Sequence, residues 1–390
     1  MRKALAALHR WAALVAGALL LVSGLSGSLM VWQAELDAAL NPAWFAPPPL
    51  RCAPAERPVA TTLALLAQAA PGAKPAIVAA PAVPGAAFQV WERRDARGLR
   101  REHFVDADCG RYLGTRLRGD TRLDRAHAVP LLYELHSRLL GGETGHTVVG
   151  VGALVLLALA LSGLWLALPR RHGLDAWRRA LTVKRGSGGP RFWYDLHRAA
   201  GLWLLPLALL LPLTGAALVF GDASKAMVGT VLPLQPWPRL ARGEAVPARL
   251  APDDYVARGA ALFPQAHWSR LTLPDASGTA ELRLLQPGEP RADTGMTRVR
   301  LDAEGRVVAV HDPLRAPAGN RVIDWMFPLH SAEALGLVAR LLWTLFGLLP
   351  ALLLASGLWL WWRRRAARAL RAAPASAAAA GTASPGRPAC

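Results

Sequence analysis

Hydrophobic and polar residues are arranged in long blocks along this chain. Four blocks are apolar and carry no charged side chain: Trp11–Trp32, Thr147–Leu168, Ala199–Phe220 and Leu341–Trp362. Each has about the twenty residues that a helix needs to cross the hydrocarbon core of a membrane. The pattern therefore predicts four transmembrane helices.

The first block follows Arg2 and Lys3, which resemble the basic start of a signal peptide. It is too long for the apolar part of a signal peptide, and no small-residue cleavage site lies at its end. A retained membrane helix is therefore favoured.

Two long polar segments separate the first helix from the second and the third from the fourth. Each begins with an amphipathic helical pattern, at residues 61–70 and 253–263, and continues with alternating runs typical of strands, at 86–94 and 101–114 and at 279–287 and 297–310. Asp108-Cys109-Gly110 and Glu304-Gly305 predict hairpin turns at matching places. Each segment is thus predicted to form a small α+β domain.

The chain is also an internal repeat. His9 and His197 are 188 residues apart, and the same shift places "SGSLMVW" at 26–32 over "TGAALVF" at 214–220. His136 and His330 are 194 apart, and that shift superimposes two copies of "SGLWL", at 162–166 and 356–360. Both copies enter the membrane in the same direction, which makes this a parallel repeat.

The predicted fold class is a mainly α membrane protein with four transmembrane helices in two parallel repeats and two small periplasmic α+β domains. The predicted order is an N-terminal segment (1–10), helix 1 (11–33), outer domain 1 (34–145), helix 2 (146–168), a loop (169–197), helix 3 (198–220), outer domain 2 (221–334), helix 4 (335–362) and a disordered tail (363–390).

The net charge of +18 is sorted along this order. The N-terminus, the middle loop and the tail hold 17 basic residues and two acidic ones, whereas the two long segments hold 28 basic and 25 acidic residues. Basic segments stay in the cytoplasm. The prediction is a multi-pass protein of a bacterial inner membrane, in contact with its lipid, with both termini cytoplasmic and no nucleic-acid partner.

Four histidines precede the apolar blocks at duplicated positions, in "LHR" (His9, His197) and "LHS" (His136, His330). A neutral imidazole is a good axial ligand for haem iron, and paired histidines on facing helices hold such cofactors. One pair at each membrane face predicts two haem b groups. The alternative is that the histidines are interfacial anchors.

Glycines follow the same repeat. Gly27 and Gly215 each lie 18 residues after a histidine, which is five helical turns, or about 27 Å. They would share that histidine's face and leave room for a flat cofactor held by the other pair. Gly163 and Gly357 recur in the second and fourth helices. The alternative is that these small residues only let helices approach closely.

Some assignments stay open. His136 and His330 lie about ten residues before their apolar blocks, and Gly141–Gly142 would have to break the helix after His136. His146 is therefore a competing ligand, and its repeat counterpart Arg340 would hold a haem propionate. Cys52 and Cys109 share one outer segment, as a disulfide or as two free thiols.

A run of arginines in the first outer domain would attract an anionic ferric chelate, unless it is merely a solvated strand and turn; its members are Arg93, Arg94, Arg97, Arg100 and Arg101. Motifs typical of nucleotide binding, ATP hydrolysis, metalloproteases and esterases are absent from the sequence. Electrons would therefore come from a quinol or a cytoplasmic reductase.

The histidine motifs, the two "SGLWL" segments with their following arginines and the outer hairpins resemble the PepSY-associated transmembrane family. Within it, the chain is most similar to iron-regulated membrane proteins that act as ferric-siderophore reductases. The resemblance implies reduction of Fe(III)-siderophore in the periplasm and release of Fe(II), with periplasmic iron-binding or transporter components as partners. Two alternatives are a haem-free, membrane-anchored binding or regulatory module and a transporter subunit for siderophore uptake.

Overall fold

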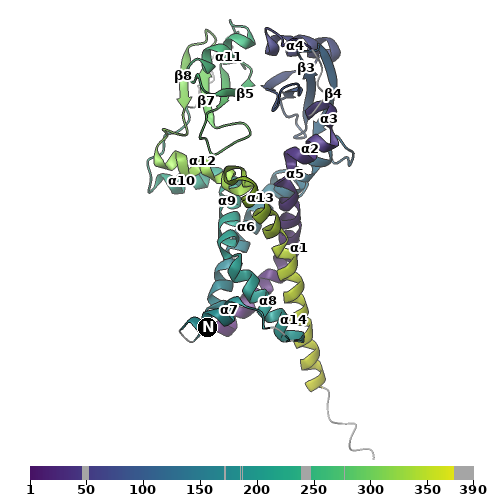
Figure 1. Cartoon of the computed structure of the whole chain (residues 1–390), viewed down its shortest axis with the longest axis vertical. Coiled ribbons are helices and arrows are strands. Elements are labelled where there is room, and N and C mark those ends of the chain that lie inside the picture. Colours follow the sequence, from purple (N-terminus) through teal and green to yellow (C-terminus); the bar gives the residue numbers. More distant parts are fainter. Residues whose placement is uncertain are drawn as a thin grey trace, which may run out of the picture.

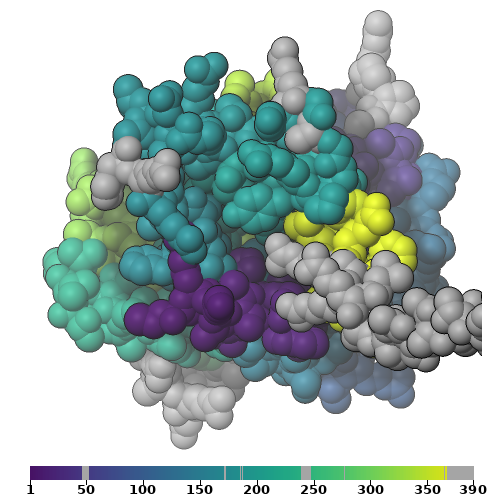
Figure 2. Space-filling model, turned by 90° about the horizontal axis from the view of Figure 1, so that it is seen from below, coloured from purple at the N-terminus to yellow at the C-terminus, as the bar shows by residue number. Residues whose placement is uncertain are grey.

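The protein consists of a column of helices with a β sheet at one end and the N-terminus at the other (Figure 1). The computed structural model describes residues 1–45, 52–170, 173–184, 186, 188–238, 247–275 and 277–372. We call the two ends of the column the sheet end and the terminal end. Figure 2 looks onto the terminal end, where the start of the chain lies beside the segment that follows the second apolar block.

The apolar blocks form the column. Three helical segments are long and apolar enough to cross a membrane, and a fourth qualifies if a bent pair is counted as one span. The helices are α1 (Arg2–Met30), α6 (Gly142–Ala167), the pair α8 (Gly189–Trp203) and α9 (Leu205–Val219), and α13 (Gly336–Gly347) followed by α14 (Leu349–Ala372).

Two predictions about this column need correction. The third block was expected to be one helix from residue 198, but α8 begins at Gly189 and meets α9 at an angle of 61°. Pro206, in the first turn of α9, has no N–H to donate to the preceding turn, which explains the break. The tail was expected to be disordered from residue 363, but α14 continues as a helix to Ala372; residues 373–390 lie outside the described part of the chain.

The two outer segments share one antiparallel sheet of eight strands, in the order β4-β3-β2-β1-β5-β6-β7-β8. The halves join where Val78 of β1 pairs with Leu271 of β5. The expectation of two separate domains is therefore wrong at the level of the sheet. The strands are β1 (Pro75–Ala79), β2 (Phe88–Glu92), β3 (Arg100–Asp106), β4 (Arg111–Arg118), β5 (His267–Thr272), β6 (Ala280–Leu285), β7 (Thr297–Leu301) and β8 (Val307–His311).

One face of the sheet is covered by two helices, α4 (Pro58–Ala69) and α11 (Pro252–Ala260). Their side chains and those of the strands form a single apolar core that includes Leu66, Tyr255 and Leu282. The halves are also tied here by Asp253, whose carboxylate accepts hydrogen bonds of 2.9 Å from the backbone N–H groups of both Val59 and Ala60. A carboxylate from the second half thus caps the first turn of a helix in the first half.

Short helices connect the sheet to the column. Helix α5 is followed by Leu139 and Leu140, both with positive φ (49° and 58°), and α12 is followed by Ala332 (φ 65°). These left-handed residues reverse the chain, so α5 and α12 lie against the column instead of continuing it. The connecting elements are α2 (Gln33–Leu40), α3 (Pro42–Phe45), α5 (Ala128–Arg138), α7 (Leu174–Leu181), α10 (Gly221–Gly229), α12 (Ala318–Ser331) and the 3₁₀ turn η1 (Glu333–Leu335).

Cys52 and Cys109 form a disulfide, with Cα atoms 5.3 Å apart. Of the two alternatives left open by the sequence, the structure contains the disulfide. The bond joins the segment before α4 to the β3–β4 turn.

A buried ion-pair network holds the sheet to the segment after α1. Glu102 accepts hydrogen bonds from Arg116 Nε (2.6 Å) and Trp91 Nε1 (2.7 Å). Arg116 also donates to Asp37 in α2 (2.8 Å). Burial alone would raise the pKa of Glu102, but Arg118 and Arg116 outweigh it and lower the pKa below its usual value of 4.5.

We expect Glu102→Gln to reduce the free energy of unfolding by about 3–5 kcal/mol, because Arg116 loses a buried charged partner. The loss is measured as a lower thermal midpoint of the detergent-solubilised chain. Because folding lowers the pKa of Glu102, its contribution is complete above its ordinary pKa and disappears as the pH falls through the lowered value. The matched control is Arg306→Gln, which removes an exposed pair with Asp302. Equal midpoints for the two variants would contradict the assignment.

Candidate functional site: two histidine pairs

At the sheet end of the column, His136 of α5 and His330 of α12 face each other. Their ring centroids are 6.3 Å apart and their planes are tilted by 40°. The two residues occupy equivalent positions in the two repeats, and the reversals after α5 and α12 bring them together. The interruption of the helix expected near Gly141–Gly142 is therefore present, although it begins at Leu139.

The hydrogen bonds of His136 determine its tautomer. Its Nδ1 lies 3.1 Å from Ser26 Oγ and 3.1 Å from the Ser23 carbonyl oxygen. A carbonyl can only accept, and the Ser26 hydroxyl already donates its hydrogen to the carbonyl of Val22 (2.6 Å). Nδ1 must then carry the proton, which leaves a lone pair on Nε2.

The other three histidines have the same arrangement. The Nδ1 of each lies near a hydroxyl that donates its own hydrogen to a carbonyl of its own helix, so the hydroxyl accepts from Nδ1–H. The pairs are His330 with Thr214 (3.0 Å), His9 with Ser162 (2.9 Å) and His197 with Ser356 (3.0 Å), and the carbonyls belong to Leu210, Leu159 and Leu353. All four imidazoles therefore present an Nε2 lone pair.

The glycines lie against these rings. A Cβ atom at Gly27 would be 3.0 Å from Cε1 of His136, and one at Gly215 would be 3.0 Å from Cε1 of His330. At Gly163 the distance to Cε1 of His9 would be 3.3 Å, whereas at Gly357 no atom of the described residues lies within 4 Å of that position. The sequence had assigned this space to a cofactor; at three of the four positions it is occupied by an imidazole.

The hydroxyl before each glycine was missed in the sequence, although its signal was visible. Each glycine is preceded by Ser or Thr: Ser26, Ser162, Thr214 and Ser356. The repeated "SG" and "TG" pairs were used only to align the repeats. Each pair supplies a hydrogen-bond acceptor for one histidine, and in three of the four pairs the glycine also leaves space for the ring of the same histidine.

The remaining predicted residues lie elsewhere. His146 is half-buried in α6 and, within the described residues, forms no hydrogen bond; His136, not His146, faces His330. Arg340 is engaged by Glu35 (2.6 Å) and the Val31 carbonyl (2.7 Å) and lies over the Trp32 ring. Its donors are thus already used in part.

The predicted arginine run lies in and around the β2–β3 hairpin. Only Arg100 of this run is half-buried, with its guanidinium 5.3 Å from the centre of the Trp91 ring. The exposed members are Arg93, Arg94, Arg97 and Arg101.

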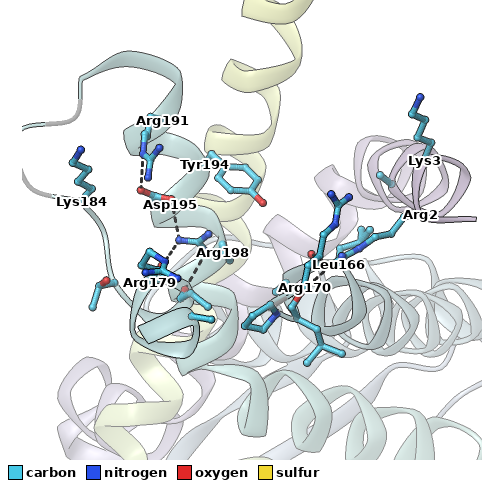
Figure 3. Close-up of a pocket in the computed structure, with 17 residues that line it drawn as sticks. Arg2, Lys3, Leu166, Arg170, Arg179, Lys184, Arg191, Tyr194, Asp195 and Arg198 are labelled. Atoms are coloured by element: carbon cyan, nitrogen blue, oxygen red, sulfur yellow. Dashed lines mark hydrogen bonds and ion pairs between the residues drawn. The ribbon is translucent and has the colours of Figure 1, made fainter. Parts of the chain in front are cut away.

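A basic cavity of about 980 Å³ lies at the terminal end (Figure 3). Ala6 and Arg198, which line it, are close in sequence to His9 and His197. Arg198 is one of the residues that line this cavity, and its guanidinium donates hydrogen bonds to Asp195 (2.9 Å) and to the carbonyl of Ala180 (3.1 Å). Arg2 donates to the carbonyls that end α6, including that of Leu166 (2.8 Å). The basic residues that line the cavity are Arg2, Lys3, Arg170, Arg179, Lys184, Arg191 and Arg198.

The geometry can be set beside known proteins. Residues 6–364 match the family described as the PepSY-associated TM region. The chain is also 30% identical over 261 residues to a Pseudomonas aeruginosa protein described as uncharacterized protein PA4219. That match covers 62% of this chain and 64% of the relative, so slightly less than two thirds of the relative's length is spanned. The family match covers nearly the whole chain, and this membrane protein therefore belongs to the PepSY-associated TM family.

Proposed function

We propose that this protein carries electrons across a bacterial inner membrane through two haem b groups and reduces an Fe(III)-siderophore at the sheet end, releasing Fe(II). His136 and His330 would hold one haem, and His9 and His197 the other. The observation that carries the proposal is the paired arrangement of His136 and His330.

The residues fit such a group. If His136 and His330 each bound one iron through Nε2 at the roughly 2 Å typical of metal–imidazole bonds, their ring centres would lie about 6 Å apart. The separation of 6.3 Å between His136 and His330 agrees with this value. Protonated Nδ1 atoms bound to hydroxyls leave Nε2 free to bind iron, as is usual for metal-ligating histidines.

The haem, when bound, supplies an iron that accepts and releases one electron at a time. The chain's own residues do the rest. The Ser and Thr hydroxyls fix the tautomer and the rotation of each imidazole. Gly27, Gly163 and Gly215 let the imidazole rings lie close to the backbone of the neighbouring helix. The charge sorting of the sequence supports a cytoplasmic terminal end, where a quinol or a cytoplasmic reductase would be the electron donor.

The first prediction concerns haem stoichiometry. The detergent-purified chain, produced with ample haem, is expected to show a sharp α-band after dithionite reduction and two haems per chain. His330→Ala is expected to reduce this to one, because the pair at the sheet end loses a ligand. Haem is quantified against protein by absorption.

The matched control is His146→Ala, which removes a histidine from the same end of the column and should leave two haems. A colourless wild-type protein would contradict the proposal and favour the haem-free binding module. Loss of one haem in His146→Ala, but not in His136→Ala, would reassign the ligand.

A second prediction concerns the hydroxyls. Thr214→Val should keep the shape of the side chain but leave His330 Nδ1–H without its hydroxyl acceptor. We expect haem loss from the sheet-end pair, measured by transfer to excess apomyoglobin, to be roughly 10–100-fold faster. Thr147→Val is the control, because the Thr147 hydroxyl donates to a carbonyl of its own helix in the same way and, within the described residues, forms no hydrogen bond with a histidine ring. Equal rates of haem loss for the two variants would show that the hydroxyls do not contribute to haem binding.

A further inference from the structure

The sheet face opposite α4 and α11 carries a row of arginines. In the register of the sheet, Arg270 of β5 pairs with Arg283 of β6, and Arg283 pairs with Arg298 of β7. Residues that are directly opposite in an antiparallel sheet have Cβ atoms about 5 Å apart, and like charges there destabilise the pair. Three cations therefore lie side by side on neighbouring strands.

The row continues across the joint between the two halves. The guanidinium groups of Arg270 and Arg100 both lie over the ring of Trp91, at 4.3 and 5.3 Å from its centre. Arg100 in turn pairs with Arg118 on β4. Residues of both repeats thus contribute to one positively charged surface, which we call the arginine face: Arg100, Arg118, Arg270, Arg283 and Arg298.

Four of the five arginines of this face form no ion pair within the described part of the chain: Arg100, Arg270, Arg283 and Arg298. Arg118 is paired with Glu102 (3.8 Å). The nearby carboxylates of Glu281 and Asp293 are occupied by Arg300 (3.0 Å) and Arg291 (2.7 Å). Among the described residues, the buried Nε atoms of Arg100 and Arg270 have no hydrogen-bond partner.

Electrostatics agree with this geometry. Burial first, and then the charges of Arg283 and Arg291, lower the pKa of Arg270 to about 10. Burial and the neighbouring Arg291 and Arg298 also lower the pKa of Arg283.

Stacking explains how the face tolerates its charge and what it leaves available. A guanidinium over an aromatic ring is stabilised through its flat face, while its N–H donors point outward in its plane. Arg298 and Arg300 likewise lie 4.7 Å from the centre of the Trp237 ring, whose buried Nε1 also has no partner among the described residues. These in-plane donors match the oxygens of carboxylate or phosphate groups.

The arginine face lies next to the histidine pair of the sheet end. Arg118 lies over the ring of Tyr133 (6.0 Å), three residues before His136. Arg291, beside the face, lies over the ring of Phe327 (4.2 Å), three residues before His330. A cavity of about 1450 Å³ borders the face and is lined by Arg100, Arg298, Arg300 and Trp237, among others. Of the arginine run that the sequence singled out, Arg93 and Arg94 also line it, whereas Arg97 and Arg101 do not.

We propose that the arginine face binds a compact anion with several carboxylate-type oxygens, beside the pair formed by His136 and His330. The anion charge class follows from the unpaired arginines themselves. Only the idea that the anion carries ferric iron rests on the proposed function. The substrate of the reductase would then be an anionic ferric chelate, not a cationic one.

The test uses the full chain in nanodiscs of zwitterionic lipid and measures citrate and ferric citrate binding by calorimetry at low salt. Wild type is expected to bind at least one of these probes, with an affinity that falls as salt is added. The double variant Arg270→Gln/Arg283→Gln should bind at least tenfold more weakly, because each arginine supplies charge-assisted hydrogen bonds. Arg306→Gln removes one positive charge from an exposed turn and should bind like wild type.

A thermal melt without ligand shows that the double variant is folded; because the arginines repel one another, we expect no lower midpoint than that of Arg306→Gln. If the double variant is unfolded, the single variant Arg298→Gln takes its place. The proposal is overturned if wild type binds neither probe or if the folded variant binds as tightly as wild type.

Failure of this inference is distinguishable from failure of the proposed function. If the chain contains no haem but binds citrate through Arg270 and Arg283, the anion site is supported and the electron-transfer function is contradicted. If the chain contains haem and ferric citrate reoxidises the double variant at the wild-type rate, the electron-transfer function is supported and the anion site is contradicted.

Discussion

The hydrogen bond between a histidine Nδ1 and a Ser or Thr hydroxyl of another helix is the interaction on which the centre of this protein depends. It occurs four times, and each time the hydroxyl donates its own hydrogen to a backbone carbonyl of its own helix. The direction of the bond is therefore fixed, and with it the side of the ring that carries a lone pair. The following residue is always glycine, and at Gly27, Gly163 and Gly215 the absence of a side chain lets the ring lie against the helix that orients it. The tautomer of each imidazole is thus set by one hydroxyl residue of a facing helix.

The duplication explains why this interaction forms pairs. A single copy would place one oriented imidazole near each end of its helices, whereas two copies related by the repeat place them opposite each other, as His136 and His330 are. The sheet reinforces the pairing from outside the column. Its two halves are joined edge to edge through β1 and β5 and through Asp253, so the helices α5 and α12 below them hold a defined separation. A continuous sheet therefore serves as a brace between the two copies.

Features that depend on local periodicity could be predicted from the sequence: the apolar blocks, the amphipathic helices, most strands and the repeat that singled out the four histidines. Features that depend on distant partners could not. Strands β1 and β5 are short and pair with each other across about 190 residues, which no local pattern reveals. The bend at Leu204 depends on Pro206, and the strongly apolar run around this proline predicts one continuous helix instead. The hydroxyl at Thr214 gains meaning only from His330, and the arginine row only from the register of three strands.

The apolar face of the sheet and the arginine row contribute to stability in opposite ways. The face under α4 and α11 buries a continuous apolar core. The other face places Arg270, Arg283 and Arg298 in register, where their mutual repulsion and partial burial lower stability. Neutral side chains would serve a purely structural sheet better at these positions. The arginine face thus lowers the stability of the sheet, and the apolar face compensates for this loss. Such an arrangement is expected where a surface binds a ligand of opposite charge.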